Sequence, residues 1–127
     1  MIECPGWEAD DVIGTLAKRA EALGDFETYM VTPDKDFAQL VTDTTRIYKP
    51  GRQSSGTEIL DKAKICENWQ VTDPLQTIDV LGLWGDASDN IPGVPGIGEK
   101  TAKKLIAEFG SIEGLLAHTD RLKGKQK

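Results

Sequence analysis

Residues 85–102 have the sequence GDASDNIPGVPGIGEKTA, which combines two aspartates with a glycine-rich segment. It places Asp86 and Asp89 three positions apart, and a Pro-Gly turn and a Gly-Ile-Gly sequence follow them. The next residues, up to Phe109, carry apolar side chains at helical spacing. The pattern predicts a carboxylate pair followed by a helix-hairpin-helix motif.

The Gly-Ile-Gly sequence suits a phosphate group. Gly96 and Gly98 permit a positive φ and let the backbone approach an anion closely. The N-terminus of the following helix adds N–H groups and the positive end of a dipole, and Lys100, Lys103 and Lys104 lie on its polar side. Taken alone, the same residues fit a Gly/Pro-rich turn between two helices with a solvated lysine face equally well.

Length and composition are those of an ordinary soluble protein. With 127 residues and 39% hydrophobic content, the chain forms one domain, or a core with a small helical appendage. No apolar run approaches the ~20 residues of a membrane span, and residues 1–3 begin neither a signal nor a transit peptide, so we expect a cytoplasmic protein. Cys4 and Cys66 lack the spacing of a zinc site, and the single histidine, His118, argues against histidine-based catalysis.

The net charge of −6 is unevenly distributed along the chain. Residues 1–92 carry 8 Lys or Arg and 17 Asp or Glu, a net charge of −9, whereas residues 93–127 carry 7 and 4, a net charge of +3. Clustered carboxylates repel one another unless they bind cations. A basic C-terminal segment can bind the phosphate backbone of a nucleic acid. Seven of the acidic residues form three short clusters, which are Glu8, Asp10 and Asp11; Asp34 and Asp36; and Asp86 and Asp89.

The first half of the chain predicts an α/β arrangement. Residues 8–23 carry apolar side chains on one helical face, and Gly24 is a good C-terminal stop. Residues 27–31 and 45–49 predict β-strands, and Asp34 and Asp36 follow the first strand, where ligands of α/β sheets gather. These acids also have a structural interpretation, because EADD at 8–11 suits the dipole of a helix N-terminus and Asp34 or Asp36 suits the cap of a short helix over residues 37–40.

The second half predicts mainly helices. The polar loop over residues 50–56 is expected to be mobile, Thr57 is expected to cap the next helix, and helices are predicted over residues 59–69 and 75–84. Trp69 and Trp84, at the ends of these helices, favour core packing over stacking on a nucleobase. A boundary near Asp73 and Pro74 divides the chain into an α/β part, residues 1–73, and a helical part, residues 74–127.

Four of these motifs together resemble a known family. EADD at 8–11, TPDKD at 32–36, GDASDN at 85–90 and IPGVPGIGEKTA at 91–102 have the order and approximate spacing of the 5′-nuclease (5′→3′ exonuclease) domain of bacterial DNA polymerase I. The broader relatives are the flap endonucleases. The resemblance covers nearly the whole chain, from Pro5 to about Lys125. It implies a partial PIN-like α/β core followed by a helix-hairpin-helix, or helix-3-turn-helix, subdomain.

The resemblance implies a structure-specific nuclease that hydrolyses phosphodiesters at RNA primers and displaced 5′ flaps with two divalent ions, Mg²⁺ or Mn²⁺. It further implies a hairpin that holds DNA without reading its sequence, with K⁺ at the hairpin carbonyls. The residues that match the family's catalytic metal ligands are Glu8, Asp10, Asp11, Asp34, Asp36, Asp86 and Asp89. The expected DNA-binding residues are Gly93, Gly96, Ile97, Gly98, Lys100, Thr101, Lys103 and Lys104.

The sequence also departs from the family. The family has an amino-terminal strand with a further metal-binding aspartate, and a segment whose acidic and basic residues clamp the reacting phosphate, and neither is found here. We therefore expect a fragment, the carboxyl-terminal half of a polymerase I nuclease domain, which is inactive on its own. The expected setting is a monomeric, nucleoid-associated bacterial protein without membrane contact, attached to a polymerase module and bound to nicked, flapped or primer-bearing duplexes.

Two other functions remain open from the sequence. The first is a non-catalytic helix-hairpin-helix module that binds DNA and whose acidic residues are caps and solvated faces. The second is a PIN-type ribonuclease, which also uses clustered acids on an α/β sheet but gives no reason for the hairpin at residues 96–98.

Overall fold

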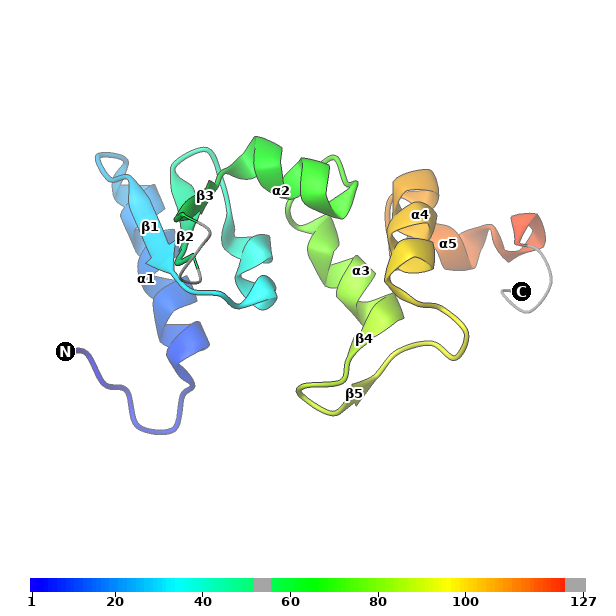
Figure 1. The fold of residues 1–127 in the computed structure, drawn as a ribbon, viewed down its shortest axis with the longest axis horizontal. Coiled ribbons are helices and arrows are strands. Elements are labelled where there is room, and N and C mark those ends of the chain that lie inside the picture. The colour runs from blue at the N-terminus through cyan, green and yellow to red at the C-terminus, as the bar shows by residue number, and fades with distance from the viewer. Residues whose placement is uncertain (52–55, 123–127) are drawn as a thin grey trace. The chain divides into compact units, whose positions relative to one another are not determined.

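A computed structural model describes residues 1–51 and 56–122 and divides into two compact units, Met1–Ile65 and Cys66–Lys127 (Figure 1). The first unit combines helices with a sheet and the second is mainly helical, so the predicted fold class is confirmed. Residues 52–55 of the predicted polar loop lie outside the described residues. Among the described helices, none has both the length and the apolar character needed to cross a membrane.

The first unit is built on a three-stranded sheet with the strand order β1-β2-β3. β1 (Thr28–Val31) and β2 (Thr45–Lys49) are parallel, with Met30 opposite Ile47, and β3 (Glu58–Leu60) pairs antiparallel to β2. The crossover between the parallel strands contains the short 3₁₀ helix η1 (Lys35–Leu40). Its Phe37 and Ala38 are buried, as are Met30 and Ile47, and together they form the centre of this unit's core.

Helix α1 (Ala9–Leu23) ends at Gly24, whose φ of 87° is left-handed, which confirms the predicted stop. Its apolar face is covered only in part. Ala17 is buried, whereas Ile13 is 38% exposed and Leu16 is 41% exposed. β1 and η1 pack against α1 in this unit.

The helix predicted over residues 59–69 is wrong at its start. Residues 58–60 form β3, and α2 (Lys62–Trp69) begins only after Asp61, whose Oδ1 accepts the N–H of Lys64 at 2.8 Å. Thr57 precedes the strand and is therefore not the cap of the helix. The apolar spacing from Ile59 onward fits a helix, but Ile59 and Leu60 pair with β2 as a strand.

The second unit packs helices around its own apolar core. α3 (Gln76–Trp84) and α4 (Glu99–Phe109) lie against each other, α5 (Ile112–Ala117) packs on α4, and the short 3₁₀ helix η2 (Thr119–Arg121) follows. Two short antiparallel strands, β4 (Gly85–Asp86) and β5 (Ile91–Pro92), join α3 to α4. Trp69 is 8% exposed and belongs to the core, as predicted. The other buried apolar residues are Val71, Val80, Leu83, Ala102, Leu105, Ile106 and Leu115.

Candidate functional site

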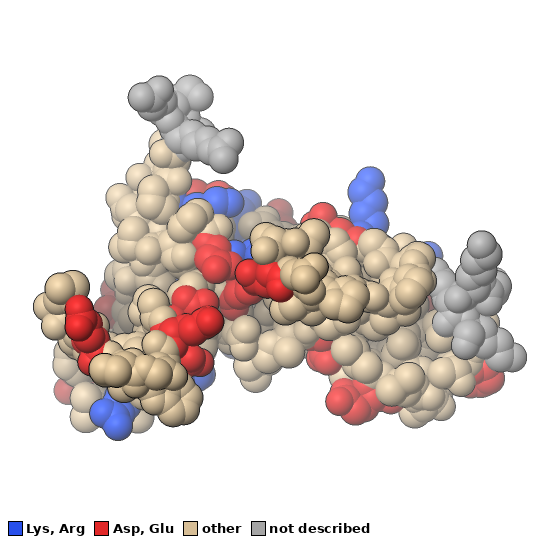
Figure 2. Space-filling view, turned by 90° about the horizontal axis from the view of Figure 1, so that it is seen from below, with Lys and Arg blue, Asp and Glu red and all other residues tan. Residues whose placement is uncertain are grey.

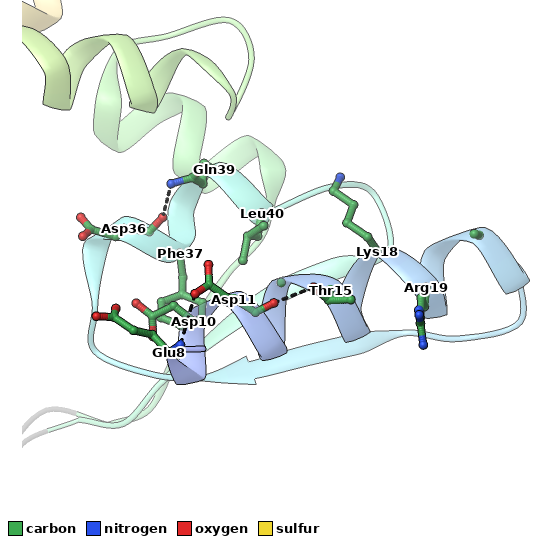
Figure 3. Close-up of a pocket in the computed structure, with 12 residues that line it drawn as sticks. Glu8, Asp10, Asp11, Thr15, Lys18, Arg19, Asp36, Phe37, Gln39 and Leu40 are labelled. Carbon is green, nitrogen blue, oxygen red and sulfur yellow. Dashed lines mark hydrogen bonds between the residues drawn. The ribbon is translucent and has the colours of Figure 1, made fainter. Parts of the chain in front are cut away.

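An acidic groove of about 780 Å³ lies in the first unit (Figure 3). Glu8, Asp10 and Asp11 line it from the start of α1, and Asp36 lines it from η1. Lys18 and other residues further along α1 line the remainder together with residues of η1. Four of the five acidic residues predicted for a metal site in this half of the chain therefore share one groove.

The chain connectivity explains why these acids meet. α1 and β1 are joined by the short connection 24–27 and run in opposite directions, so the start of the helix lies near the carboxyl end of the strand (Figure 3). η1 follows that strand end directly. Two acidic stretches that are distant in sequence thus reach the edge of the sheet at which ligands of α/β folds gather.

Two of the carboxylates also have local structural roles. Asp11 Oδ2 accepts the N–H of Glu8 at 3.2 Å, as part of a capping box at the start of α1. Asp34 Oδ1 accepts the N–H of Asp36 at 2.9 Å and caps η1, and Asp34 is not among the residues that line the groove. Because an ionised carboxylate has two oxygens and about four acceptor positions, one such bond leaves it able to bind a cation.

The three acidic residues at the start of α1 lie close together along the chain and line the same groove. Within the described part of the chain, Glu8, Asp10 and Asp11 form no ion pair, and Lys18, the cation nearest along α1, is bonded to Glu21 at 3.4 Å. Figure 2 shows several acidic side chains, in red, on one face of this unit. Carboxylates held close together on a fixed framework repel one another, and a hard divalent cation relieves that repulsion.

The remaining predicted pair, Asp86 and Asp89, lies in the second unit at the turn between β4 and β5. Asp86 is 8% exposed, and its Oδ1 accepts both the N–H of Ser88 at 2.9 Å and the Ser88 hydroxyl. Ser88 was not among the predicted site residues, although an aspartate followed two positions later by a serine is a typical turn pattern. It fixes the orientation of the Asp86 carboxylate.

Residues 94–97 form the turn that leads into α4. The N–H of Ile97 donates to the carbonyl of Val94 at 3.0 Å, and Gly96 between them has a φ of 83°. With Pro95 before this glycine, the pattern is that of a type II turn. Gly98 has a φ of −92° as the N-cap of α4, so the expected use of positive φ is confirmed at Gly96 and wrong at Gly98.

The first turn of α4 offers backbone donors to an anion. Among the described residues, no side chain caps this helix, so its first N–H groups and its positive dipole end stay available. Lys100 and Lys104 are exposed on the helix. Lys103 differs, because its Nζ donates to Glu99 and to the backbone carbonyl of Asn68.

Gly93 has a packing role that sequence reasoning missed. A Cβ at this position would collide with the carbonyl oxygen of Trp84, and a Cβ on Gly85 would collide with the backbone of Gly93. Gly85 also has a positive φ of 81°. The two glycines therefore allow β4 and β5 to approach closely, which sets the turn that carries Asp86.

Comparison with known proteins gives two family matches. The family model described as 5′-3′ exonuclease, N-terminal resolvase-like domain, matches residues 1–70, and the model described as 5′-3′ exonuclease, C-terminal SAM fold, matches residues 72–127. DNA polymerase I of Bacillus subtilis (strain 168) is 48% identical over 98% of the chain. The chain spans 14% of that relative's length.

Solved structures agree with these matches. The 5′-exonuclease of T5 with bound divalent metal ions (zinc) has a TM-score of 0.81 and 29% identity, covering 98% of this chain and 44% of that one. The bacteriophage T5 flap endonuclease in a complex with DNA and metal ions has a TM-score of 0.80 and 28% identity, covering 98% and 43%. Because the family models account for residues 1–70 and 72–127, the chain belongs to the 5′-3′ exonuclease family, as its motifs predicted.

Proposed function

We propose that this chain is part of the nuclease region of a DNA polymerase I-like protein, which hydrolyses phosphodiesters at 5′ flaps and primers with divalent metal ions. The observation that carries the proposal is the acidic groove, in which Glu8, Asp10 and Asp11 of α1 line the same space as Asp36 of η1. Membership of the 5′-3′ exonuclease family supports the type of reaction.

The donor set of the groove fits a hard cation. Its lining contains carboxylates, and the lining residues that the structure describes include no Cys or His, so Mg²⁺ and Mn²⁺ suit it better than a softer metal. When bound, such ions activate a water molecule and stabilise a departing oxygen. The chain holds the ligands in place through the capping box, the η1 cap and Ser88. The proposed ligands that line the groove are Glu8, Asp10, Asp11 and Asp36. The match to the family's motifs adds Asp34, Asp86 and Asp89 as proposed ligands, which are not among the residues that line it.

The hairpin before α4 is proposed to bind the DNA backbone without reading base sequence. The uncapped first turn of α4 and the exposed Lys100 and Lys104 support this, because backbone N–H groups and lysine side chains suit phosphates, and phosphate contacts carry no sequence information. The DNA complex of the T5 relative supports the same ligand class. A K⁺ ion at the hairpin carbonyls is part of the proposal.

The proposal extends to the whole protein. Since the chain spans 14% of the B. subtilis relative, we propose that a polymerase module belongs to the same protein. We also propose a monomer that acts in the cytoplasm on nicked, flapped or primer-bearing duplexes. The competing function is a DNA-binding module without catalysis, which the capping roles of Asp11 and Asp34 favour, since such roles need no metal.

A 5′-flap assay separates the two functions. This chain and a version extended to the full nuclease region are incubated with the substrate in Mg²⁺ and in Mn²⁺. We expect the extended version to cut and this chain to bind with negligible cutting, because a misplacement of about 1 Å alone can cost ~10²-fold in rate. Comparable cutting by both contradicts the idea of a fragment.

Substitutions in the extended version test the groove itself. Asp10→Asn combined with Asp36→Asn is expected to abolish cutting while leaving flap binding in place. Asp25→Asn is the matched control, since Asp25 is an exposed acid of the same unit that does not line the groove. Absence of cutting by the unsubstituted extended version favours the non-catalytic module.

A further inference from the structure

Lys103 lies in a different environment from the other lysines of α4. Its Nζ donates to Glu99 Oε1 at 2.7 Å and to the backbone carbonyl oxygen of Asn68 at 3.1 Å. The same atom lies 5.5 Å from the centroid of the Trp69 ring. The side chain of Lys103 is 15% exposed, whereas Lys100 and Lys104 are exposed residues.

These contacts occupy two of the three donors of the ammonium group and place its charge against a ring. A lysine has three N–H donors, and two of them have oxygen acceptors while the charge lies over an aromatic face. The aliphatic part of the side chain covers apolar surface at the same time. To contact a phosphate, Lys103 must therefore give up its ion pair with Glu99, its hydrogen bond to Asn68 and its contact with the Trp69 ring. Lys104 is exposed and needs only to exchange solvent for the phosphate.

The contact with Asn68 has a further electrostatic benefit. Asn68 is the penultimate residue of α2, and α2 has no basic residue in its own last turn. The C-terminal end of a helix carries partial negative charge on its unpaired carbonyls. Lys103 supplies from α4 the cation that the end of α2 lacks.

We propose that Lys103 is a positioning residue, which fixes α4 to the C-terminal end of α2, and that Lys100 and Lys104 make the phosphate contacts of this helix. The second half of the statement rests on the proposed DNA-binding function. The first half rests on the contacts of Lys103 in the free protein, so the two parts can fail separately.

Lysine footprinting tests both parts on the unaltered chain. The protein is acetylated briefly with and without a DNA duplex, and the modification of each lysine is followed by mass spectrometry. We expect Lys103 to react several-fold more slowly than Lys104 in the free protein, and DNA to protect Lys100 and Lys104. Equal reaction of Lys103 and Lys104 without DNA overturns the positioning role. Failure of DNA to protect Lys100 and Lys104 overturns the proposed hairpin contact and leaves the first result standing.

Matched substitutions provide the second measurement. Lys103→Met and Lys104→Met remove the same charge from neighbouring positions, and the affinity for a duplex is measured over a range of salt concentrations. Lys104→Met is expected to lower the salt slope by about one, and Lys103→Met to leave the slope unchanged. An equal reduction by both variants makes Lys103 a phosphate contact and overturns the inference.

Tryptophan fluorescence reports the contact with Trp69 directly. Lys103→Met is expected to lower the melting temperature and to change the tryptophan emission, whereas Lys104→Met changes neither. In a Trp69→Phe background the emission difference caused by Lys103→Met is expected to disappear. Persistence of that difference in the Trp69→Phe background contradicts the assigned contact.

Discussion

Gly93, Gly96 and Gly98 lie close together in sequence but are held by different constraints. Gly93 faces the carbonyl of Trp84 across a gap with no room for a Cβ, Gly96 has a φ of 83°, and Gly98 has an extended backbone with open space beside it. From the sequence, all three were expected to be DNA-binding residues of the hairpin. Their physical roles are packing, turn geometry and access to the first turn of α4.

We expect alanine at these positions to destabilise the chain in the order Gly93, Gly96, Gly98. Overpacking against rigid backbone costs about 1–3 kcal/mol and can cost more, and a left-handed conformation costs an alanine roughly 1–2 kcal/mol. Gly98→Ala meets neither penalty and serves as the matched control. Urea unfolding followed by circular dichroism measures the free energies of unfolding, and a loss at Gly98 equal to that at Gly96 contradicts the assignment of the turn.

Asp34 combines a cap with a proposed metal ligand, and two substitutions separate these roles. Asp34→Ala removes the acceptor for the N–H of Asp36 and is expected to lower the free energy of unfolding by about 1 kcal/mol in chelator. Asp34→Asn keeps a good capping side chain and removes the charge, so its stability in chelator stays near that of the wild type. Thermal unfolding in chelator tests this, and equal losses in both variants mean that the cap is not the stabilising feature.

At the scale of elements, Gln76 shows how a single side chain connects two segments of the second unit. Its Oε1 accepts the N–H groups of Thr72 at 2.8 Å and Asp73 at 3.1 Å, and its Nε2 donates to the carbonyl of Gly110 at 2.8 Å. It thereby links the loop before α3 to the end of α4.

We expect Gln76→Ala to destabilise the chain by about 1 kcal/mol, because it removes hydrogen bonds to exposed backbone groups that water can then solvate. Gln76→Glu keeps an acceptor for the loop and loses the donor to Gly110, so an intermediate loss is expected. Chemical denaturation of the three proteins measures the effect. A Gln76→Ala variant as stable as the wild type contradicts the role of this link.

The elements that the sequence predicts correctly are those with local signals. α1 has a periodic apolar face and Gly24 as its stop, and β2 was predicted over residues 45–49 because of its strand-forming residues. β3 was missed because Ile59 and Leu60 also fit a helical spacing, and only the partner strand β2 decides between the two. Local patterns thus locate most elements, whereas pairing between distant segments decides the exceptions.

The candidate site follows the same distinction. The clusters EADD and TPDKD were identified from their acidic composition. Asp10 and Asp36 line one groove, which agrees with the rule that ligands of α/β sheets bind at the carboxyl ends of the strands. The contacts of Lys103 could not be predicted, because its partner Asn68 lies 35 positions away. The roles of individual lysines therefore need the tertiary structure, even where the motif itself is evident.

At the scale of the whole molecule, the acidic and basic parts of the chain correspond to the two proposed tasks. Residues 1–92 hold the carboxylates and carry a net charge of −9, whereas residues 93–127 hold the hairpin lysines and carry +3. A net charge of −6 therefore does not exclude DNA, because a concentrated acidic site that binds divalent cations is neutralised by them. The proposed hydrolysis requires that the groove bind such a cation.

Calorimetric titration of Mn²⁺ tests this most directly, with the wild-type chain, Asp10→Asn and Asp25→Asn compared in the same buffer. Asp10 lines the groove, whereas Asp25 is exposed in the same unit outside it, so each variant loses the same charge at a different place. We predict that the wild type and Asp25→Asn bind Mn²⁺ with equal affinity and that Asp10→Asn binds it at least about tenfold more weakly, a difference of ~1.4 kcal/mol. Equal affinity in all three proteins, or no binding by the wild type, would contradict the account.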